Sequence, residues 1–233
     1  MGSTVNGGKR KCTHEEKSLV IMKSTLSRLP IYYCYLQQKL KDGVEYISSS
    51  LIAENLSLNP VQVRKDLASV SSVPGKPKRG FLTKRLMADM EAYLGYDNHD
   101  EAILVGVGNL GRTLLQYQGF DNYGLSIAVG FDINPDLHGK RIGGKSVMPM
   151  EKLPSLAKRL GIHVGIIAVP STQAQAVADL MIANGIRAIW NFSPSHINIP
   201  RGVIIKNENL AASLAVLAKE LNKNIAAGKT LPF

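Results

Sequence analysis

The chain has 233 residues, of which 45% are hydrophobic and 20% charged, with 28 Lys and Arg against 18 Asp and Glu and a formal net charge of +10. This length suits one large or two modest domains, and the composition excludes a wholly disordered chain. No apolar run approaches the roughly 18 residues of a membrane-spanning helix, and two cysteines cannot form a disulfide scaffold, so we expect a cytoplasmic protein with reduced thiols and no membrane partner.

Four segments are expected in chain order. Residues 1–14 are rich in Gly, Ser and Lys and form a flexible tail with nothing to bury. Residues 15–94 follow a helical pattern with one proline-rich interruption. Residues 95–206 alternate short apolar runs with helical stretches, and residues 207–233 end the chain with a helix and a tail. The apolar runs are 102–105, 127–131, 164–169, 186–190 and 203–205. This alternation predicts an α/β domain whose parallel sheet is covered by helices on both faces.

Within the first domain, a short helix is predicted over residues 49–55. Ser48 is a favourable N-cap, because its hydroxyl can accept a hydrogen bond from a free amide of the first turn. We expect the apolar side of this helix to carry Leu51, Ile52 and Leu56. A tight turn follows and ends at Asn59.

A second helix is predicted to begin at Asn59-Pro60, since Asn caps helices and Pro suits the first turn. Gln62 lies three residues beyond the cap, as in a capping box. One face is expected to hold Val63, Leu67 and Val70, and the opposite face Val61, Arg64, Lys65 and Ala68. This pattern is typical of a DNA-binding helix-turn-helix, in which Arg64 and Lys65 reach bases or phosphates in the major groove.

A basic, turn-rich stretch follows over residues 74–80. Its cations are Lys76, Lys78 and Arg79, and Gly and Pro interrupt regular structure around them. Such a stretch is typical of a wing that lies against the phosphate backbone. The region 58–85 holds seven basic residues and one acidic residue, which favours double-stranded DNA as a partner. The alternative is a small helical bundle with a solvated basic loop.

A phosphate-binding turn is predicted over residues 106–111, Gly106-Val107-Gly108-Asn109-Leu110-Gly111, between an apolar strand and a helix. The first glycine allows the tight turn, the second lets the backbone approach a pyrophosphate, and the third lets helix and strand pack closely. Asp132 ends the next apolar run about 20 residues further on, where a carboxylate accepts ribose hydroxyls. No Lys or Arg follows it directly, so we expect NAD(H) rather than NADP(H).

Loops after two further strands are expected to complete this site. They contain Val169-Pro170 and residues 191–194, Asn191-Phe192-Ser193-Pro194, although plain turn chemistry explains such prolines equally well. His196 is the one histidine placed to approach a nicotinamide, and no carboxylate is evidently paired with it. We therefore expect neither catalytic residues nor a metal site. The alternatives are a small NAD-dependent oxidoreductase with a basic assembly domain and a module for another nucleotide, such as coenzyme A.

In their order and spacing, several short motifs of this sequence resemble those of the Rex family of bacterial redox-sensing transcriptional repressors. The resemblance extends from about Ser27 to Leu221 and is carried by residues 28–33, 63–67, 106–112, 130–132, 168–170 and 191–194. It implies an N-terminal winged helix-turn-helix domain, a Rossmann domain, and a final helix swapped between the subunits of a homodimer. It also implies an inverted-repeat operator that is released when NADH binds, whereas NAD⁺ competes without causing release.

The resemblance assigns roles to particular residues as well. It implies that the turn 106–111, Tyr117, Asp132, Val169, Pro170, Asn191, Ser193 and Pro194 contact the dinucleotide, and that Arg64 and Lys65 read DNA. Three features depart from the family: Cys34 replaces an arginine, Asn209 replaces an aspartate, and the wing has Pro77-Lys78-Arg79 where relatives have more glycine. The arginine and aspartate form an ion pair in the family, so the switch of this chain is expected to be weaker or to use other contacts.

Overall fold

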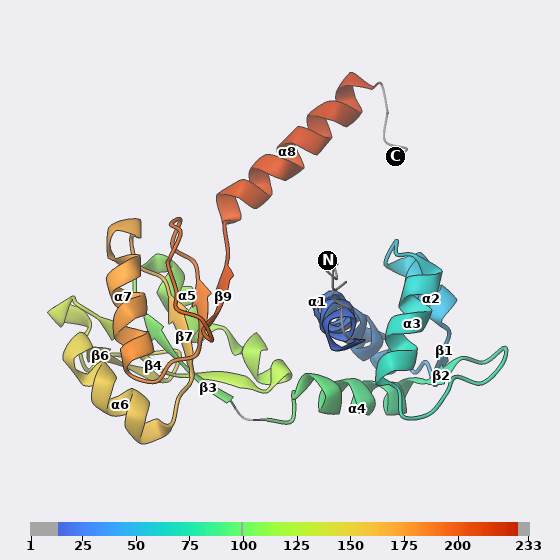
Figure 1. Cartoon of the computed structure of the whole chain (residues 1–233), viewed down its shortest axis with the longest axis horizontal. Coiled ribbons are helices and arrows are strands. Elements are labelled where there is room, and N and C mark those ends of the chain that lie inside the picture. Colours follow the sequence, from blue (N-terminus) through green and yellow to red (C-terminus); the bar gives the residue numbers. More distant parts are fainter. Residues whose placement is uncertain (1–13, 99, 228–233) are drawn as a thin grey trace, which may run out of the picture. The chain divides into compact units, whose positions relative to one another are not determined.

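The structure is a computed structural model that describes residues 14–98 and 100–227 (Figure 1). The predicted tail therefore lies outside the described residues, apart from His14, which begins the first helix. The chain divides into two compact units that meet at Asp97-Asn98, whereas the sequence placed the boundary after residue 94. The second unit also includes the C-terminal helix.

The first unit is mostly helical. Its elements are α1 (His14–Lys41), β1 (Tyr46–Ile47), α2 (Ser49–Asn55), α3 (Pro60–Val70), β2 (Phe81–Leu82) and α4 (Thr83–Leu94). β1 and β2 pair antiparallel, and the segment between α3 and β2 contains a further bridge between Lys76 and Gly80. This is the architecture of a winged helix-turn-helix.

Local capping explains the two short helices. The Ser48 hydroxyl accepts from the amide of Leu51, and the Asn59 side chain accepts from the amides of Val61 and Gln62, as the sequence predicts. The capping box is incomplete in its expected form, because the Gln62 side chain donates to Asp66 four residues ahead.

The predicted apolar faces are confirmed for α3 and only in part for α2. Val63, Leu67 and Val70 are buried. In α2 the prediction for Leu51 is wrong: its side chain is 39% exposed, and Ala53 is buried instead. A seven-residue helix buries a narrow face, which Ile52 and Ala53 fill.

The second unit contains a seven-stranded sheet in the order β5-β6-β4-β3-β7-β8-β9. Its strands are β3 (Asp100–Val105), β4 (Leu125–Asp132), β5 (Arg141–Ile142), β6 (Lys145–Pro149), β7 (Val164–Ile167), β8 (Ala188–Asn191) and β9 (Ile204–Asn207). The sequence did not predict β5 and β6, and it started β8 two residues early at Ile186. Because β5 pairs antiparallel with β6, the sheet is mostly rather than wholly parallel.

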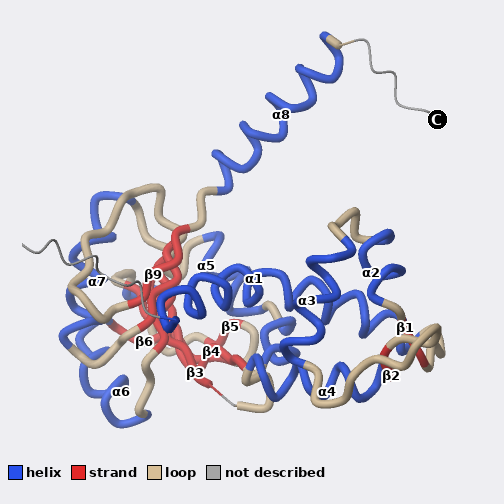
Figure 2. Tube along the Cα trace, turned by 45° about the vertical axis from the view of Figure 1, so that its right-hand side comes forward, coloured by secondary structure: helices blue, strands red, loops and turns tan. Residues whose placement is uncertain are grey.

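Helices cover both faces of this sheet (Figure 2). They are α5 (Asn109–Gln116), α6 (Leu153–Leu160) and α7 (Ser171–Ala183), with short 3₁₀ turns over Gln118–Tyr123, Pro135–Leu137 and Met150–Lys152. One apolar core lies between the sheet and α6 and α7, and a second one packs Leu115 of α5 against the other face. The chain reverses direction across the sheet between β3 and β7, so their carboxyl ends form the topological switch point at which α/β folds bind ligands.

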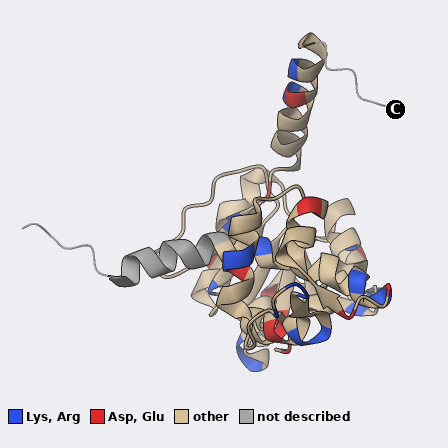
Figure 3. Cartoon of the chain, turned by 90° about the vertical axis from the view of Figure 1, so that its right-hand side faces the viewer, with Lys and Arg blue, Asp and Glu red and all other residues tan. Residues whose placement is uncertain are grey.

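The last helix, α8 (Leu210–Ala226), begins at an Asn209 cap whose side chain accepts from the amide of Ala212. Every side chain of α8 is exposed, including Leu210, Leu214 and Leu217. Its charged residues lie in the C-terminal half (Figure 3). None of the helices in the described part of the chain is long and apolar enough to cross a membrane.

Candidate nucleic-acid interface and dinucleotide-binding site

The exposed face of α3 borders a groove in the first unit. Arg64 and Lys65 are exposed, as predicted, and Arg64 and Ala68 line a hollow of about 720 Å³. The start of α2 and the loop before β2 supply the other walls, which include Lys76 and Lys78. A helix with outward cations beside a basic loop fits the major groove and the adjacent phosphates of a duplex.

The basic loop has a defined conformation. Lys78 has a φ of +63° and Gly80 a φ of +83°, and a Cβ on Gly80 would overlap the Ile47 carbonyl. The Arg79 guanidinium lies 4.6 Å from the centre of the Tyr46 ring, and Lys76 Nζ lies 5.9 Å from it. Cation–π contact of this kind holds two wing cations on β1. Sequence reasoning missed Tyr46, which comes about 30 residues before the wing.

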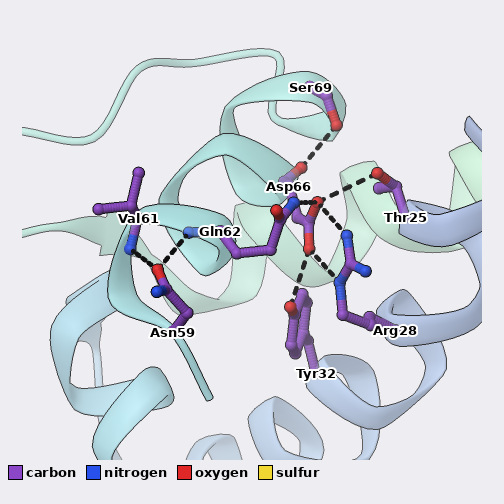
Figure 4. Close-up of polar contacts among 8 residues, drawn as sticks. All are labelled: Thr25, Arg28, Tyr32, Asn59, Val61, Gln62, Asp66 and Ser69. Carbon is purple, nitrogen blue, oxygen red and sulfur yellow. Dashed lines mark hydrogen bonds and ion pairs between the residues drawn. The ribbon is translucent and has the colours of Figure 1, made fainter. Parts of the chain in front are cut away.

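A buried carboxylate joins α3 to α1 (Figure 4). Asp66 is 2% exposed and accepts hydrogen bonds from four side chains. Arg28 donates through Nε to Oδ2 at 2.7 Å and through Nη2 to Oδ1 at 2.9 Å. The Tyr32 hydroxyl donates to Oδ2 at 2.9 Å, while Thr25 Oγ1 and Gln62 Nε2 donate to Oδ1 at 3.0 and 2.9 Å. This set of contacts is here called the Asp66 cluster.

The cluster shifts the pKa of its members. Burial raises the pKa of Asp66, but the hydrogen bonds, that of Arg28 first, outweigh burial and hold the pKa below its ordinary value. Burial and the adjacent carboxylate raise the pKa of Tyr32 to about 12. Asp66 is therefore ionised at neutral pH. Sequence reasoning missed this cluster. A signal was present, because Asp66 shares the buried face of its helix with Val63, Leu67 and Val70, and a buried acidic residue usually has a polar or charged side chain as its partner.

In the second unit, the glycine-rich turn has the predicted geometry. Gly106 has a φ of +95° and follows β3, and a Cβ on it would overlap the Ala168 carbonyl. A Cβ on Gly111 would overlap the Gly106 carbonyl oxygen. In contrast, a Cβ on Gly108 would meet no atom within 4 Å. Gly106 and Gly111 are thus required by the packing of the turn, whereas the space beside Gly108 is open, and its role in approaching a pyrophosphate stays a prediction.

Asp132, at the end of β4, is tied to this turn. Its Oδ2 accepts from the Val107 amide at 2.6 Å, and its Oδ1 accepts from the Asn134 amide at 2.8 Å. Each oxygen of a carboxylate has two lone pairs, so each can still accept a further hydrogen bond. The ribose role predicted for Asp132 is therefore compatible with its contacts.

A cavity of about 290 Å³ lies at the switch point. Of the predicted dinucleotide residues, Gly106, Gly108, Asp132, Val169 and Pro170 line it. The other lining residues, which were not predicted to contact a dinucleotide, are Val105, Ile133, Met150, Ala168, Gln173 and Val177. The structure thus joins the ends of β3, β4 and β7 in one apolar cleft with a carboxylate at its edge, a typical setting for an adenosine moiety.

The remaining predicted residues lie outside the lining of that cavity. Val107 and Gly111 are buried in the turn, and Asn109 and Leu110 begin α5. Asn191 is fully buried, and its side-chain amide donates to the carbonyls of Ser193 and Ser195 and to Asn207, which is the turn chemistry weighed as the alternative. Ser193 is buried and Pro194 exposed. A dinucleotide role for residues 191–194 stays a prediction.

An aromatic row crosses the face of the sheet next to α5. The rings of Tyr117 and Phe120 lie 4.9 Å apart, those of Phe120 and Trp190 5.9 Å apart, and those of Trp190 and Phe192 4.4 Å apart. Trp190 Nε1 donates to Glu208 at 3.2 Å. Tyr117 is 55% exposed at the end of this row, so its ring is accessible to a ligand.

The residues that line the cavity include neither a histidine nor a cysteine. His196 is exposed, and no cluster of three or more His, Cys, Asp or Glu able to hold a metal ion occurs within residues 14–98 and 100–227. Cys34 lies exposed on α1. The arrangement can bind a nucleotide and a duplex.

Comparisons with known proteins agree with both halves of this description. A model described as a putative DNA-binding protein N-terminus matches residues 21–68, and a model described as a CoA binding domain matches residues 97–195. The chain is 41% identical over 210 residues to the redox-sensing transcriptional repressor Rex of Porphyromonas gingivalis, covering 89% of this chain and 96% of that protein. It is 35% identical over 207 residues to the Rex repressor of Bacteroides fragilis, covering 89% and 94%.

Solved structures show the same likeness. A crystal structure of RSP, a Rex-family repressor, in complex with NAD⁺ and operator DNA superposes with a TM-score of 0.80 at 33% identity, covering 90% of this chain and 98% of that one. The complex of RSP with NADH also superposes with a TM-score of 0.80, covering 88% and 96%.

Proposed function

Because the chain belongs to the Rex family of redox-sensing transcriptional repressors, we propose that it represses transcription from operator DNA and leaves that DNA when it binds NADH. One observation carries this proposal: the chain combines a basic groove beside an exposed helix with a glycine-rich turn that is hydrogen-bonded to Asp132, at the end of the next strand. The first feature suits a duplex, and the second suits a dinucleotide without a ribose phosphate.

The switch requires that NADH bind more tightly to the form with low DNA affinity. A ligand with equal affinity for both forms shifts nothing, however tightly it binds. NAD⁺ then competes for the same cavity without causing release. In this account the chain is a regulator rather than an enzyme, in keeping with the repressors to which it is similar.

A homodimer on an inverted repeat completes the proposal. Ile204 of β9, an edge strand, is 71% exposed, and Leu210, Leu214 and Leu217 of α8 are exposed as well. A solvated helix with this many exposed leucines is unfavourable, so a second copy is expected to cover it by exchange of α8.

Two other readings make different predictions. A small oxidoreductase would consume NADH steadily in the presence of a carbonyl substrate, whereas a repressor would not. A coenzyme A module would bind a nucleotide that carries a ribose phosphate. Asp132 opposes this, since its carboxylate oxygens beside the ribose would repel the oxygens of a phosphate group.

Fluorescence anisotropy at fixed salt tests the proposal. A labelled duplex from upstream of the chain's own gene is titrated with protein and then with NADH, NAD⁺ or coenzyme A. Release by NADH and not by NAD⁺ is the expected result. DNA affinity that neither NADH nor NAD⁺ changes would contradict redox sensing. If the protein does not distinguish this duplex, or any duplex it enriches from a random pool, from unselected DNA of equal length, the repressor proposal fails. Salt is fixed because phosphate contacts make affinity strongly salt-dependent.

The substitution Arg64→Ala is expected to weaken operator binding by about 10-fold or more, because a base or phosphate contact in the major groove contributes about 1–3 kcal/mol. NADH affinity should be unchanged, since Arg64 is in the other unit. The matched control is Arg159→Ala, which removes an exposed arginine from α6. Equal operator affinity in Arg64→Ala and wild type would show that α3 does not read the DNA.

NADH is expected to quench the fluorescence of Trp190, the one tryptophan of the chain. Reduced nicotinamide absorbs where tryptophan emits, whereas NAD⁺ does not, so energy transfer should distinguish the two ligands at equal saturation. Trp190→Phe provides the background. Emission that stays constant at saturating NADH would place the nicotinamide far from the aromatic row.

A further inference from the structure

The reading helix α3 is held to the rest of its unit in two different ways. Val63, Leu67 and Val70 are buried and give apolar contact. Such contact is non-directional, so it resists separation of the helices far more than a small rotation of α3 about its axis. Hydrogen bonds depend strongly on angle, and those of the Asp66 cluster link α3 to α1.

Three of the four donors come from one face of α1. Thr25, Arg28 and Tyr32 are three and four residues apart, a spacing that aligns them on a helix. They reach Asp66 from one side, while Gln62 of α3 itself closes another (Figure 4). Both oxygens of the carboxylate accept more than one hydrogen bond, so rotation of α3 in either direction breaks several of them.

We propose that Asp66 is a positioning residue for DNA reading: through its contacts with α1 it sets the rotation of α3, and so the direction in which Arg64 and Lys65 point. This inference rests on the proposed function. Arg64 and Asp66 are two residues apart and therefore about 200° apart around the helix, so the residue that faces the duplex and the residue that faces α1 lie on opposite sides.

A small rotation has a large effect on reading. A turn of about 30° moves a side chain at a radius of about 6 Å by roughly 3 Å, which is close to the spacing of one base pair. Contacts to phosphates tolerate such a shift better than contacts to base edges. Every phosphate attracts a cation in the same way, whereas each base edge presents its own pattern of hydrogen-bond donors and acceptors. Loss of the Asp66 cluster should therefore lower the preference for the operator more than it lowers affinity for DNA in general.

The test removes the cluster without leaving a buried charge. The variant carries Thr25→Val, Arg28→Met, Tyr32→Phe and Asp66→Leu, which replace every charged or hydroxyl group of the cluster by an apolar one, and apolar replacement of a whole buried network is often tolerated by the fold. The probes are a duplex that the wild-type protein enriches from a random pool and an unselected duplex of the same length. Anisotropy gives the ratio of the two affinities at each of two salt concentrations.

The expected result is a fall of at least 10-fold in that ratio, with affinity for unselected DNA, NADH affinity and the unfolding midpoint close to wild type. The matched control is Lys39→Gln with Asp42→Asn, which removes an ion pair at the end of α1 and leaves the Asp66 cluster in place. A variant that folds normally and keeps the wild-type ratio overturns the inference.

If the fourfold variant does not fold, two single substitutions decide. Tyr32→Phe and Thr25→Val each remove one hydrogen bond, and each is expected to lower the ratio about two- to fivefold, because single hydrogen bonds contribute modestly. An unchanged ratio in both overturns the inference. If the wild-type protein itself enriches no sequence, the proposed function fails and this inference fails with it. If the wild-type protein enriches a sequence and every variant keeps the wild-type ratio of affinities, this inference fails while the proposed function stands.

Discussion

Valine at position 108 is expected to raise the Kd for NADH at least 100-fold while the protein remains folded, a loss of about 2.7 kcal/mol of binding free energy. The side chain of Gly108→Val would point into space that no protein atom occupies within 4 Å. In a glycine-rich turn of this kind, that space is where the backbone approaches the pyrophosphate. Calorimetric titration with NADH measures the affinity, and thermal unfolding shows that the fold is retained.

Gly111→Ala is the matched contrast to Gly108→Val. Its Cβ would overlap the carbonyl oxygen of Gly106, so this smaller substitution should destabilise the second unit itself. The two variants separate loss of a ligand from loss of the fold. Normal NADH affinity in Gly108→Val would mean that the dinucleotide does not lie on this turn.

Arg28→Met is expected to destabilise the first unit by about 3 kcal/mol, because it leaves the Asp66 carboxylate buried without its ionic partner. Arg28 is 23% exposed, which lets water offset part of that cost. Urea unfolding followed by far-ultraviolet circular dichroism measures the effect. Adding Asp66→Leu removes the orphaned charge, so the double variant should recover most of the loss. A single variant as stable as wild type would show that Thr25, Tyr32 and Gln62 suffice to hold the carboxylate.

The same pair predicts a pH dependence of unfolding. The hydrogen bonds hold the pKa of folded Asp66 below its ordinary, unfolded value. Their contribution to stability is therefore fully present above the unfolded pKa and is lost as the pH falls through the folded pKa. The free energy of unfolding should decline below about pH 4 in the wild type, and less steeply in Arg28→Met with Asp66→Leu.

Sequence reasoning succeeded where the physics is local. The caps at Ser48 and Asn59, the buried face of α3 and the glycine spacing of the phosphate turn each depend on a few neighbouring residues. It failed where partners are distant in sequence. Thr25, Arg28 and Tyr32 meet Asp66 from about 35–40 residues away, and no spacing rule connects them before α1 and α3 are packed together.

The sheet shows the same division. The long apolar strands were predicted, whereas β6 mixes Lys145, Ser146 and Pro149 with two apolar residues and lacks a clear period. In the cavity, Gly108 and Asp132 carry a recognisable motif. Met150 of a 3₁₀ turn and Gln173 of α7 also line it, and no local pattern marks them because the whole fold brings these elements to the cavity.

The exposed helix α8 links folding to protein concentration. A helix of 17 residues is marginal in water when nothing covers its apolar face, so the proposed second copy would supply most of its stability. By mass action, dilution then dissociates the two copies, and α8 unfolds as they separate. Helix content should rise with concentration, and occupancy of an operator should rise more steeply than in proportion to the number of chains in the cell. The copy number of the protein would thus set a threshold below which its genes are expressed whatever the redox state.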